Sequence, residues 1–243
     1  MIVTFTDFGW CGPYLGQIHA ALIREAPRVP IVDLLVDAPA HDPRAAAYLL
    51  AAFGANFPTG TIFLAVVDPG VGSDRAGIAI EIDGRWYVGP DNGLFEQVCR
   101  RATSLPVWIR LCHRQPLPSA TFHGRDLFAP VAARLAKGRP APGEIVASGL
   151  RFPDWPDDWP AIVYIDSFGN AMTAARAAAL PSAATVEVAG HQLPRYRTFS
   201  DAESGTAFWY ENSSGLVEIA VNGGRAADVL GLTLGQEIVI TSV

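Results

Sequence analysis

The sequence predicts an α/β domain followed by an all-β domain, and two observations carry that prediction. In residues 1–140, apolar runs typical of buried strands alternate with segments of helical periodicity. Beyond residue 156, short apolar runs separated by turns follow one another without a long helical pattern. We therefore expect an α/β domain over 1–156, with a mostly parallel sheet and flanking helices, and a β-barrel domain over 157–243.

The elements of the first domain follow from this alternation. Asp42 and Pro43 have the residue types of an N-cap and a first helical position. The expected strands are 2–5, 31–36, 61–67, 76–82 and 86–88. The expected helices are 13–25, 43–53, 92–101 and 126–137.

The second domain is expected to follow two connectors rich in Pro, Gly and Asp, 138–144 and 152–160. The run Ala-Gly-His-Gln-Leu-Pro at 189–194 predicts a hairpin. The expected strands of this domain are 161–166, 185–188, 216–221 and 237–241.

Charge and cysteine usage limit the classes of partner. The 243 residues carry a net charge of −6, which argues against nucleic acid or an anionic membrane as the main partner. The three cysteines have no CxxC spacing, so neither a disulfide framework nor a zinc site is indicated. No apolar run reaches membrane-spanning length, and the first strand starts without a signal-like leader. We expect a cytoplasmic protein.

Two acidic residues, Asp7 and Asp68, directly follow expected buried strands. Ligands of parallel sheets bind beyond the carboxyl ends of strands, so both are well placed for a site. Asp7 either accepts hydrogen bonds from a ribose diol or caps the helix that follows. The glycine turn after Asp68 folds Arg75 back toward it, either within a site or as a surface ion pair of little energetic weight.

Further polar residues have weaker local signals. Asn92 follows another strand, where a cap or turn is the more frequent role. His123 lies beside Phe122, although a lone histidine is most often structural. The remaining histidines are expected at surface or structural positions: His19, His41, His113 and His191. In the second domain, small polar groups and glycines serve either turns or a site for a zwitterion and a base edge: Asp166, Asn170, Asn212, Ser213, Ser214, Asn222 and Gly223.

Several common site types are absent from the sequence. There is no GxGxxG after the first strand, no GxxxxGK[ST] and no GxSxG. Histidine and acidic residues lack the spacing of metal ligands. We therefore expect neither a metal nor an organic cofactor.

Taken in order, the motifs TDFG (residues 6–9), VVDPGVG with Arg75, GPDNG, FHGRDLFAP, DSFGN and NSSG with Asn222 resemble the S-adenosyl-L-methionine (SAM) hydrolases. These enzymes, also called SAM hydroxide adenosyltransferases, are related to the fluorinases and chlorinases. The resemblance spans nearly the whole chain. It implies hydrolysis of SAM to adenosine and L-methionine, and homotrimers whose substrate lies between the first domain of one subunit and the second domain of its neighbour.

The same resemblance implies roles for individual residues. Asp68, Arg75 and His123 would activate water, and Asp7 would hold the ribose hydroxyls. Ser213 and Ser214 would lie near the methionine carboxylate, and Asp166 near the amino group. The remaining expected substrate contacts are Phe8, Trp10, Asn92, Phe122, Phe168, Asn170, Asn222 and Gly223.

Two alternatives remain. A SAM-dependent halogenase would form a 5′-halogenated adenosine, but the loop that fluorinases insert after the glycine turn is missing and Gly124 stands where they carry Ser. A non-catalytic adenosine or SAM binder has no evident need for Asp68, Arg75 and His123 together.

Overall fold

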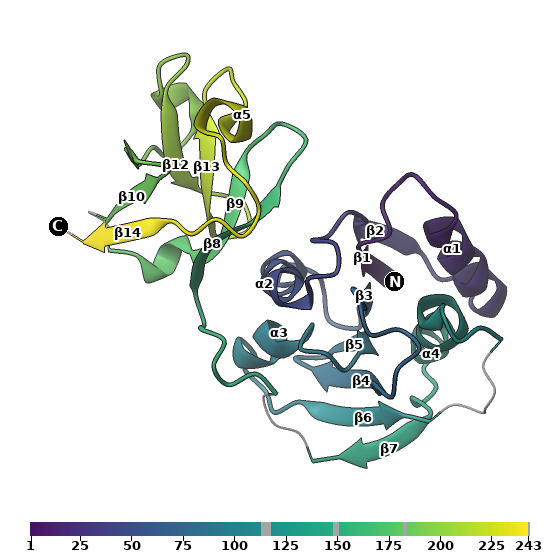
Figure 1. Ribbon diagram of the computed structural model, residues 1–243. Coiled ribbons are helices and arrows are strands. Elements are labelled where there is room, and N and C mark those ends of the chain that lie inside the picture. The colour runs from purple at the N-terminus through teal and green to yellow at the C-terminus, as the bar shows by residue number, and fades with distance from the viewer. Residues whose placement is uncertain (113–117, 148–150, 182–183, 243) are drawn as a thin grey trace. The chain divides into compact units, whose positions relative to one another are not determined.

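The computed structural model describes residues 1–112, 118–147, 151–181 and 184–242. The chain forms two compact units, Met1–Pro153 and Asp154–Val243 (Figure 1). Each unit has its own apolar core. Within the described ranges, no helix has both the length and the apolar character needed to cross a membrane.

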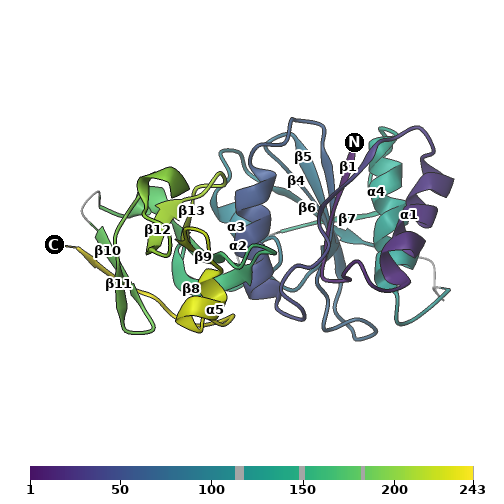
Figure 2. The ribbon, with the colours of Figure 1, turned by 90° about the horizontal axis from the view of Figure 1, so that it is seen from above.

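The first unit has three layers, with a seven-stranded sheet between two pairs of helices. The strands are β1 (Ile2–Thr6), β2 (Ile31–Leu35), β3 (Ile62–Val66), β4 (Gly77–Ile82), β5 (Arg85–Pro90), β6 (Val107–Leu111) and β7 (Gly143–Val146). The helices are α1 (Tyr14–Glu25), α2 (Pro43–Gly54), α3 (Glu96–Arg100) and α4 (Ala129–Ala136). Helices α1 and α4 cover one face of the sheet, and α2 and α3 cover the other (Figure 2).

The expectation of a mostly parallel sheet is wrong, because the sheet is mixed. In the order β2-β1-β3-β5-β4-β6-β7, the first four strands are parallel and the last three join by antiparallel pairing. The change of direction arises between β4 and β5. Asp83 and Gly84 connect them with φ of 48° and 70°, the two left-handed residues of a tight hairpin turn.

The neighbouring strands β1 and β3 bring the two predicted acidic residues together. They pair in parallel with Thr6 opposite Val66, so both strands end at the same edge. Asp7 follows one end and Asp68 follows the other after a single residue. Pairing of distant segments therefore assembles this edge of the sheet.

The start of α2 agrees with the sequence-based prediction, whereas the starts of α3 and α4 differ from it. Asp42 caps α2 as expected, with its side chain accepting from the Ala45 amide at 2.9 Å. The helix expected over 92–101 is reduced to α3, because the chain around Asn92 forms a turn instead. The helix expected over 126–137 is preceded by a π-helical turn, Gly124–Phe128, directly after His123.

The second unit contains a four-stranded and a three-stranded sheet, ordered β12-β13-β9-β8 and β11-β10-β14. Its elements are β8 (Trp159–Ile165), β9 (Ala171–Arg176), β10 (Ala184–Val188), β11 (His191–Leu193), β12 (Ala207–Glu211), β13 (Leu216–Val221), β14 (Val239–Ser242) and the short helix α5 (Ala226–Leu230). The predicted hairpin is present as β10 and β11. Two isolated bridges, Ala161 with Glu237 and Arg195 with Trp209, connect the edges of the two sheets.

Gly89 tests the packing at the carboxyl end of β5. A Cβ at this position would lie 2.0 Å from the Ala65 carbonyl oxygen and 3.0 Å from the Phe95 ring. Gly89→Ala should lower the free energy of unfolding by about 1–3 kcal/mol, because the strands must separate to accommodate it. Urea unfolding of purified protein measures this.

Gly16 provides the matched control, because a Cβ there meets nothing within 4 Å and α1 favours alanine. Gly16→Ala should stabilise by up to about 1 kcal/mol. Equal unfolding midpoints for Gly89→Ala and wild type would contradict the close packing of β3 and β5.

Candidate active site

A pocket of about 320 Å³ opens beyond the carboxyl ends of β1 and β3. Its volume lies within the range of small-molecule sites, roughly 300–1,000 Å³. Five predicted site residues line it: Asp7, Phe8, Asp68, Phe122 and His123. Its other lining residues are Tyr14, Ala40, His41, Val66, Val71, Thr121 and Gly124.

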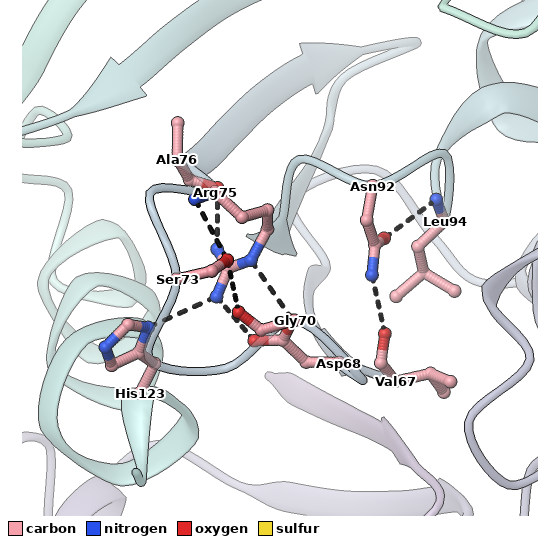
Figure 3. A network of polar contacts seen from close by, with 9 residues as sticks. All are labelled: Val67, Asp68, Gly70, Ser73, Arg75, Ala76, Asn92, Leu94 and His123. Atoms are coloured by element: carbon pink, nitrogen blue, oxygen red, sulfur yellow. Dashed lines mark hydrogen bonds and ion pairs between the residues drawn. The ribbon is translucent and has the colours of Figure 1, made fainter. Parts of the chain in front are cut away.

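Asp68 and Arg75 form a buried, two-pronged ion pair (Figure 3). Arg75 Nε donates to Oδ1 at 3.1 Å and Nη2 donates to Oδ2 at 2.5 Å. The side chains are 5% and 10% exposed, so a surface ion pair, the alternative interpretation, is wrong. The intervening turn is held by Ser73, whose hydroxyl donates to the Gly70 carbonyl and accepts from the Arg75 amide.

The same guanidinium contacts His123. Arg75 Nη2 lies 3.2 Å from His123 Nδ1, and Nη1 donates to the Ala76 carbonyl at 2.6 Å (Figure 3). Because a guanidinium only donates hydrogen bonds, Nδ1 is the acceptor. An imidazole that accepts at Nδ1 has its proton on Nε2.

Burial and charge act on Asp68 in opposite directions. Burial raises the pKa of the Asp68 carboxyl above its usual range, and the charge and hydrogen bonds of Arg75 oppose that shift. The net result is a raised pKa, so burial is the stronger effect. A carboxylate with a raised pKa is a stronger base than an exposed one, which suits it to accept a proton.

Asp7 is held at the pocket by the main chain. Its Oδ2 accepts a hydrogen bond from the backbone amide of His41 at 3.1 Å. His41 has a φ of 60°, a left-handed conformation that is uncommon outside glycine. The first helix begins after Pro13 without a side-chain cap, so the alternative role of Asp7 as its cap is wrong.

Aromatic rings form one wall of the pocket. Phe8, Tyr14 and Phe122 contact one another with ring centroids 5.5–5.9 Å apart. Arg125 lies over Phe122 at 5.0 Å and also binds Asp126 and Gln17. The aromatic wall is therefore in contact with a polar network through Arg125.

Asn92 and Trp10 do not line this pocket. Asn92 uses its side chain within the turn, donating to the Val67 carbonyl at 2.9 Å and accepting from the Leu94 amide (Figure 3). This is the cap-and-turn role that its local sequence favours. Trp10 is 71% exposed.

In the second unit, two predicted segments lie side by side. Asp166 closes the β8–β9 turn by accepting from the amides of Phe168 and Asn170. The segment after β13, which contains Asn222 and Gly223, packs on this turn through Arg225, which donates to the Ser167 carbonyl at 2.7 Å. Phe168 is 74% exposed.

The turn with Ser213 and Ser214 joins β12 and β13 near the other end of β9. Leu216, just after this turn, pairs with Arg176, whereas Ile219 pairs with Ala171 beside the β8–β9 turn. The register of β13 with β9 shifts between Leu216 and Glu218, that is, between the two positions.

Sequence reasoning missed several residues of the pocket. His41 is exposed, as expected, but it also lines the pocket and binds Asp7 through its amide. Tyr14 follows the TDFG motif by five residues, and Thr121 directly precedes the FHGRDLFAP motif. Their closeness to these motifs could have identified them as pocket residues. His19 binds Asp33 at 2.8 Å, and His113 lies outside the described residues.

Among the residues that the structure describes, no three His, Cys, Asp or Glu side chains gather in a way that could hold a metal ion.

Comparison with known proteins finds matches over both units. Residues 2–145 match the SAM hydroxide adenosyltransferase N-terminal domain, and residues 160–239 match the C-terminal domain. An (R)-S-adenosyl-L-methionine hydrolase of Thermus thermophilus is 40% identical, over 96% of both chains. A fluorinase of Nocardia brasiliensis is 25% identical, over 98% of this chain and 95% of its own.

A crystal structure of an uncharacterized conserved protein from Thermotoga maritima is 30% identical, with a TM-score of 0.88 and full coverage of both chains. The two family domains together cover most of the sequence, in the order that the motifs predict. This chain belongs to the SAM hydroxide adenosyltransferase family.

Proposed function

We propose that this protein hydrolyses SAM to adenosine and L-methionine. The observation that carries the proposal is the buried Asp68–Arg75 pair in contact with the half-buried His123, at the pocket that Asp7 also lines. Family membership and the hydrolase name of the Thermus thermophilus relative support the same reaction.

In the proposed reaction, water attacks C5′ of the substrate in line with the departing sulfur. The new C5′–O bond forms as the C5′–S bond breaks, and sulfur takes that electron pair to leave as neutral methionine. The leaving group needs no proton. The site must therefore supply a positioned water and an acceptor for the proton that this water loses.

We assign a different role to each of the three residues. Asp68 accepts the water proton, because its carboxylate retains acceptor capacity beside the bonds from Arg75. His123 orients the water by donating from Nε2, since its Nδ1 faces the guanidinium. Arg75 fixes both partners, and its charge favours hydroxide over water. The proton then passes from Asp68 to solvent.

The apolar wall of Phe8, Tyr14 and Phe122 favours this charge-neutralising step. Hydroxide and sulfonium lose their charges as they react. A site with few water molecules therefore favours the transition state over the separated ions.

We further propose which residues contact each part of the substrate. Asp7 would accept hydrogen bonds from the ribose hydroxyls with the oxygen that His41 does not occupy. The second unit would bind methionine through Asp166, Ser213 and Ser214. The segment at Asn222 and Gly223, with Phe168 and Asn170, would contact the nucleoside, while Asn92 and Trp10 would support it from the first unit.

The proposal also covers the barrel form of the second unit, the oligomeric state and the cellular compartment. The bridges between its two sheets support a barrel for the second unit. The family resemblance implies a homotrimer in which neighbouring subunits complete each site, and the exposed rings of Trp10 and Phe168 would be covered there. The three free cysteines, Cys11, Cys99 and Cys112, fit a reducing compartment and hence the cytoplasm.

The product mixture tests the reaction. Incubation with SAM in chloride-free buffer should yield equal amounts of adenosine and methionine by mass spectrometry, and the yield should not change with EDTA or chloride. A 5′-chloro-adenosine that appears only with chloride would indicate the halogenase alternative. Retained adenosine without turnover would indicate a binding protein.

The pH dependence tests the role of Asp68. Because its carboxyl must be ionised to accept a proton and its pKa is raised, kcat/KM should fall as the pH drops, with an inflection above the ordinary Asp range near 4. Asp68→Asn should lower kcat by roughly 10²–10⁴. Asp74→Asn, an exposed residue of the same turn, is the control and should behave as wild type. Full turnover by Asp68→Asn would overturn the assignment.

Adenosine affinity tests the role of Asp7. Asp7→Ala should weaken adenosine binding by about 10–100-fold in calorimetry, because charge-assisted hydrogen bonds to the ribose are lost. Asp7→Asn, which retains an acceptor for the His41 amide, should lose less. An unchanged affinity in Asp7→Ala would exclude ribose binding by this residue.

A further inference from the structure

A buried acidic residue in the second unit, Glu218, has no part in the chemistry above. Its exposure is 2%. In the sheet register it lies between Tyr210 of β12 and Met172 of β9. Its neighbours along β13, Val217 and Ile219, belong to the apolar core. The carboxyl group therefore lies on the face of the sheet opposite that core.

Two hydrogen bonds hold this carboxyl group. Tyr210 donates its hydroxyl to Oε1 at 2.5 Å, and Asn212 donates Nδ2 to Oε2 at 2.8 Å. Asn212 is itself buried, and its Oδ1 accepts from the amides of Ser214 and Leu216 at 2.9 and 3.0 Å. A continuous series of hydrogen bonds therefore runs from Glu218 to the Ser213–Ser214 turn.

Asp166, the other predicted methionine contact, interacts electrostatically with Glu218. Burial raises the pKa of the Glu218 carboxyl, hydrogen bonds from Tyr210 and Asn212 oppose this, and the charge of Asp166 raises it further. Burying such a group costs free energy that an apolar side chain would not. Stability alone therefore gives no reason for an acid at this position. Its place on β13, between the Ser213–Ser214 turn and the β8–β9 turn, gives one.

We propose that Glu218 is a positioning residue for the methionine end of the substrate. It holds Asn212, and through it the Ser213–Ser214 turn, at a fixed spacing from Asp166. A preformed turn binds the substrate without a further ordering cost. This inference rests on the proposed SAM hydrolysis.

Steady-state kinetics and adenosine calorimetry on Glu218→Ala test it. The KM for SAM should rise about tenfold or more, with a smaller change in kcat. The Kd for adenosine should not change, because adenosine lacks the methionine end. Glu218→Gln, whose amide keeps the shape and an acceptor for Asn212, should restore KM to within about threefold of wild type.

Two further variants separate positioning from general destabilisation. Asn212→Ala and Tyr210→Phe each remove one hydrogen bond from the same carboxyl group. Asn212→Ala also removes the two bonds that Asn212 accepts within the turn, so its KM should rise in any case. The double variant Glu218→Ala/Asn212→Ala should then have a KM close to that of Asn212→Ala alone, because Glu218 acts through Asn212. Tyr210→Phe should leave KM near wild type, whereas additive KM increases in the double variant would indicate a merely structural role for Glu218. Glu187→Ala, on the strand β10 of the same unit, is the residue-type control and should behave as wild type.

The outcomes also distinguish this inference from the proposed function. Wild-type protein that does not hydrolyse SAM would overturn both. With wild-type turnover present, an unchanged KM in Glu218→Ala, or additive KM increases in the double variant, overturns the positioning role alone. If Glu218→Ala does not fold, Glu218→Leu, which fills the same buried space but accepts no hydrogen bond, takes its place: a raised KM supports the positioning role and a wild-type KM overturns it.

Discussion

The parallel pairing of β1 with β3 is the constraint on which the candidate site depends. It brings the ends of two strands, separated by some sixty residues of chain, to one edge of the sheet. Asp7 and Asp68 then line the same pocket without any motif linking them in sequence. The other parts of the site are added to this edge. The glycine turn returns Arg75 to Asp68, and the π-helical turn after His123 starts beside them.

The buried ion pair gives this edge a carboxyl group with a raised pKa. A buried carboxylate without a partner would be very costly, and a fully compensated one would be a weak base. The pair with Arg75 lies between these two cases. Arg75 supplies hydrogen bonds and an opposite charge to Asp68, but the pKa of Asp68 stays raised by burial. The same guanidinium faces Nδ1 of His123, a contact in which the ring nitrogen can only accept. One arginine thus contacts both neighbours at the pocket.

Local patterns predicted much of this molecule, and pairing between distant segments accounts for what they missed. Alternating apolar runs located β1, β3 and β13, and the residue types at Asp42 and Pro43 located the start of α2. The mixed sheet was missed because Asp83-Gly84 is a two-residue signal inside a long apolar region. Motif order pointed to Asp68, Arg75 and His123, whereas His41 has no local signal because it acts through its main chain.

That main-chain contact has a consequence for how the pocket can diverge. Asp7 is oriented by the amide of residue 41, so its geometry does not depend on which side chain residue 41 carries. His41 is also one of the residues that line the pocket. Position 41 can therefore vary the shape and charge of the pocket while the carboxylate stays in place. The left-handed backbone restricts the choice chiefly to Gly, Asn, Asp and His, a small and chemically diverse set for engineering substrate preference.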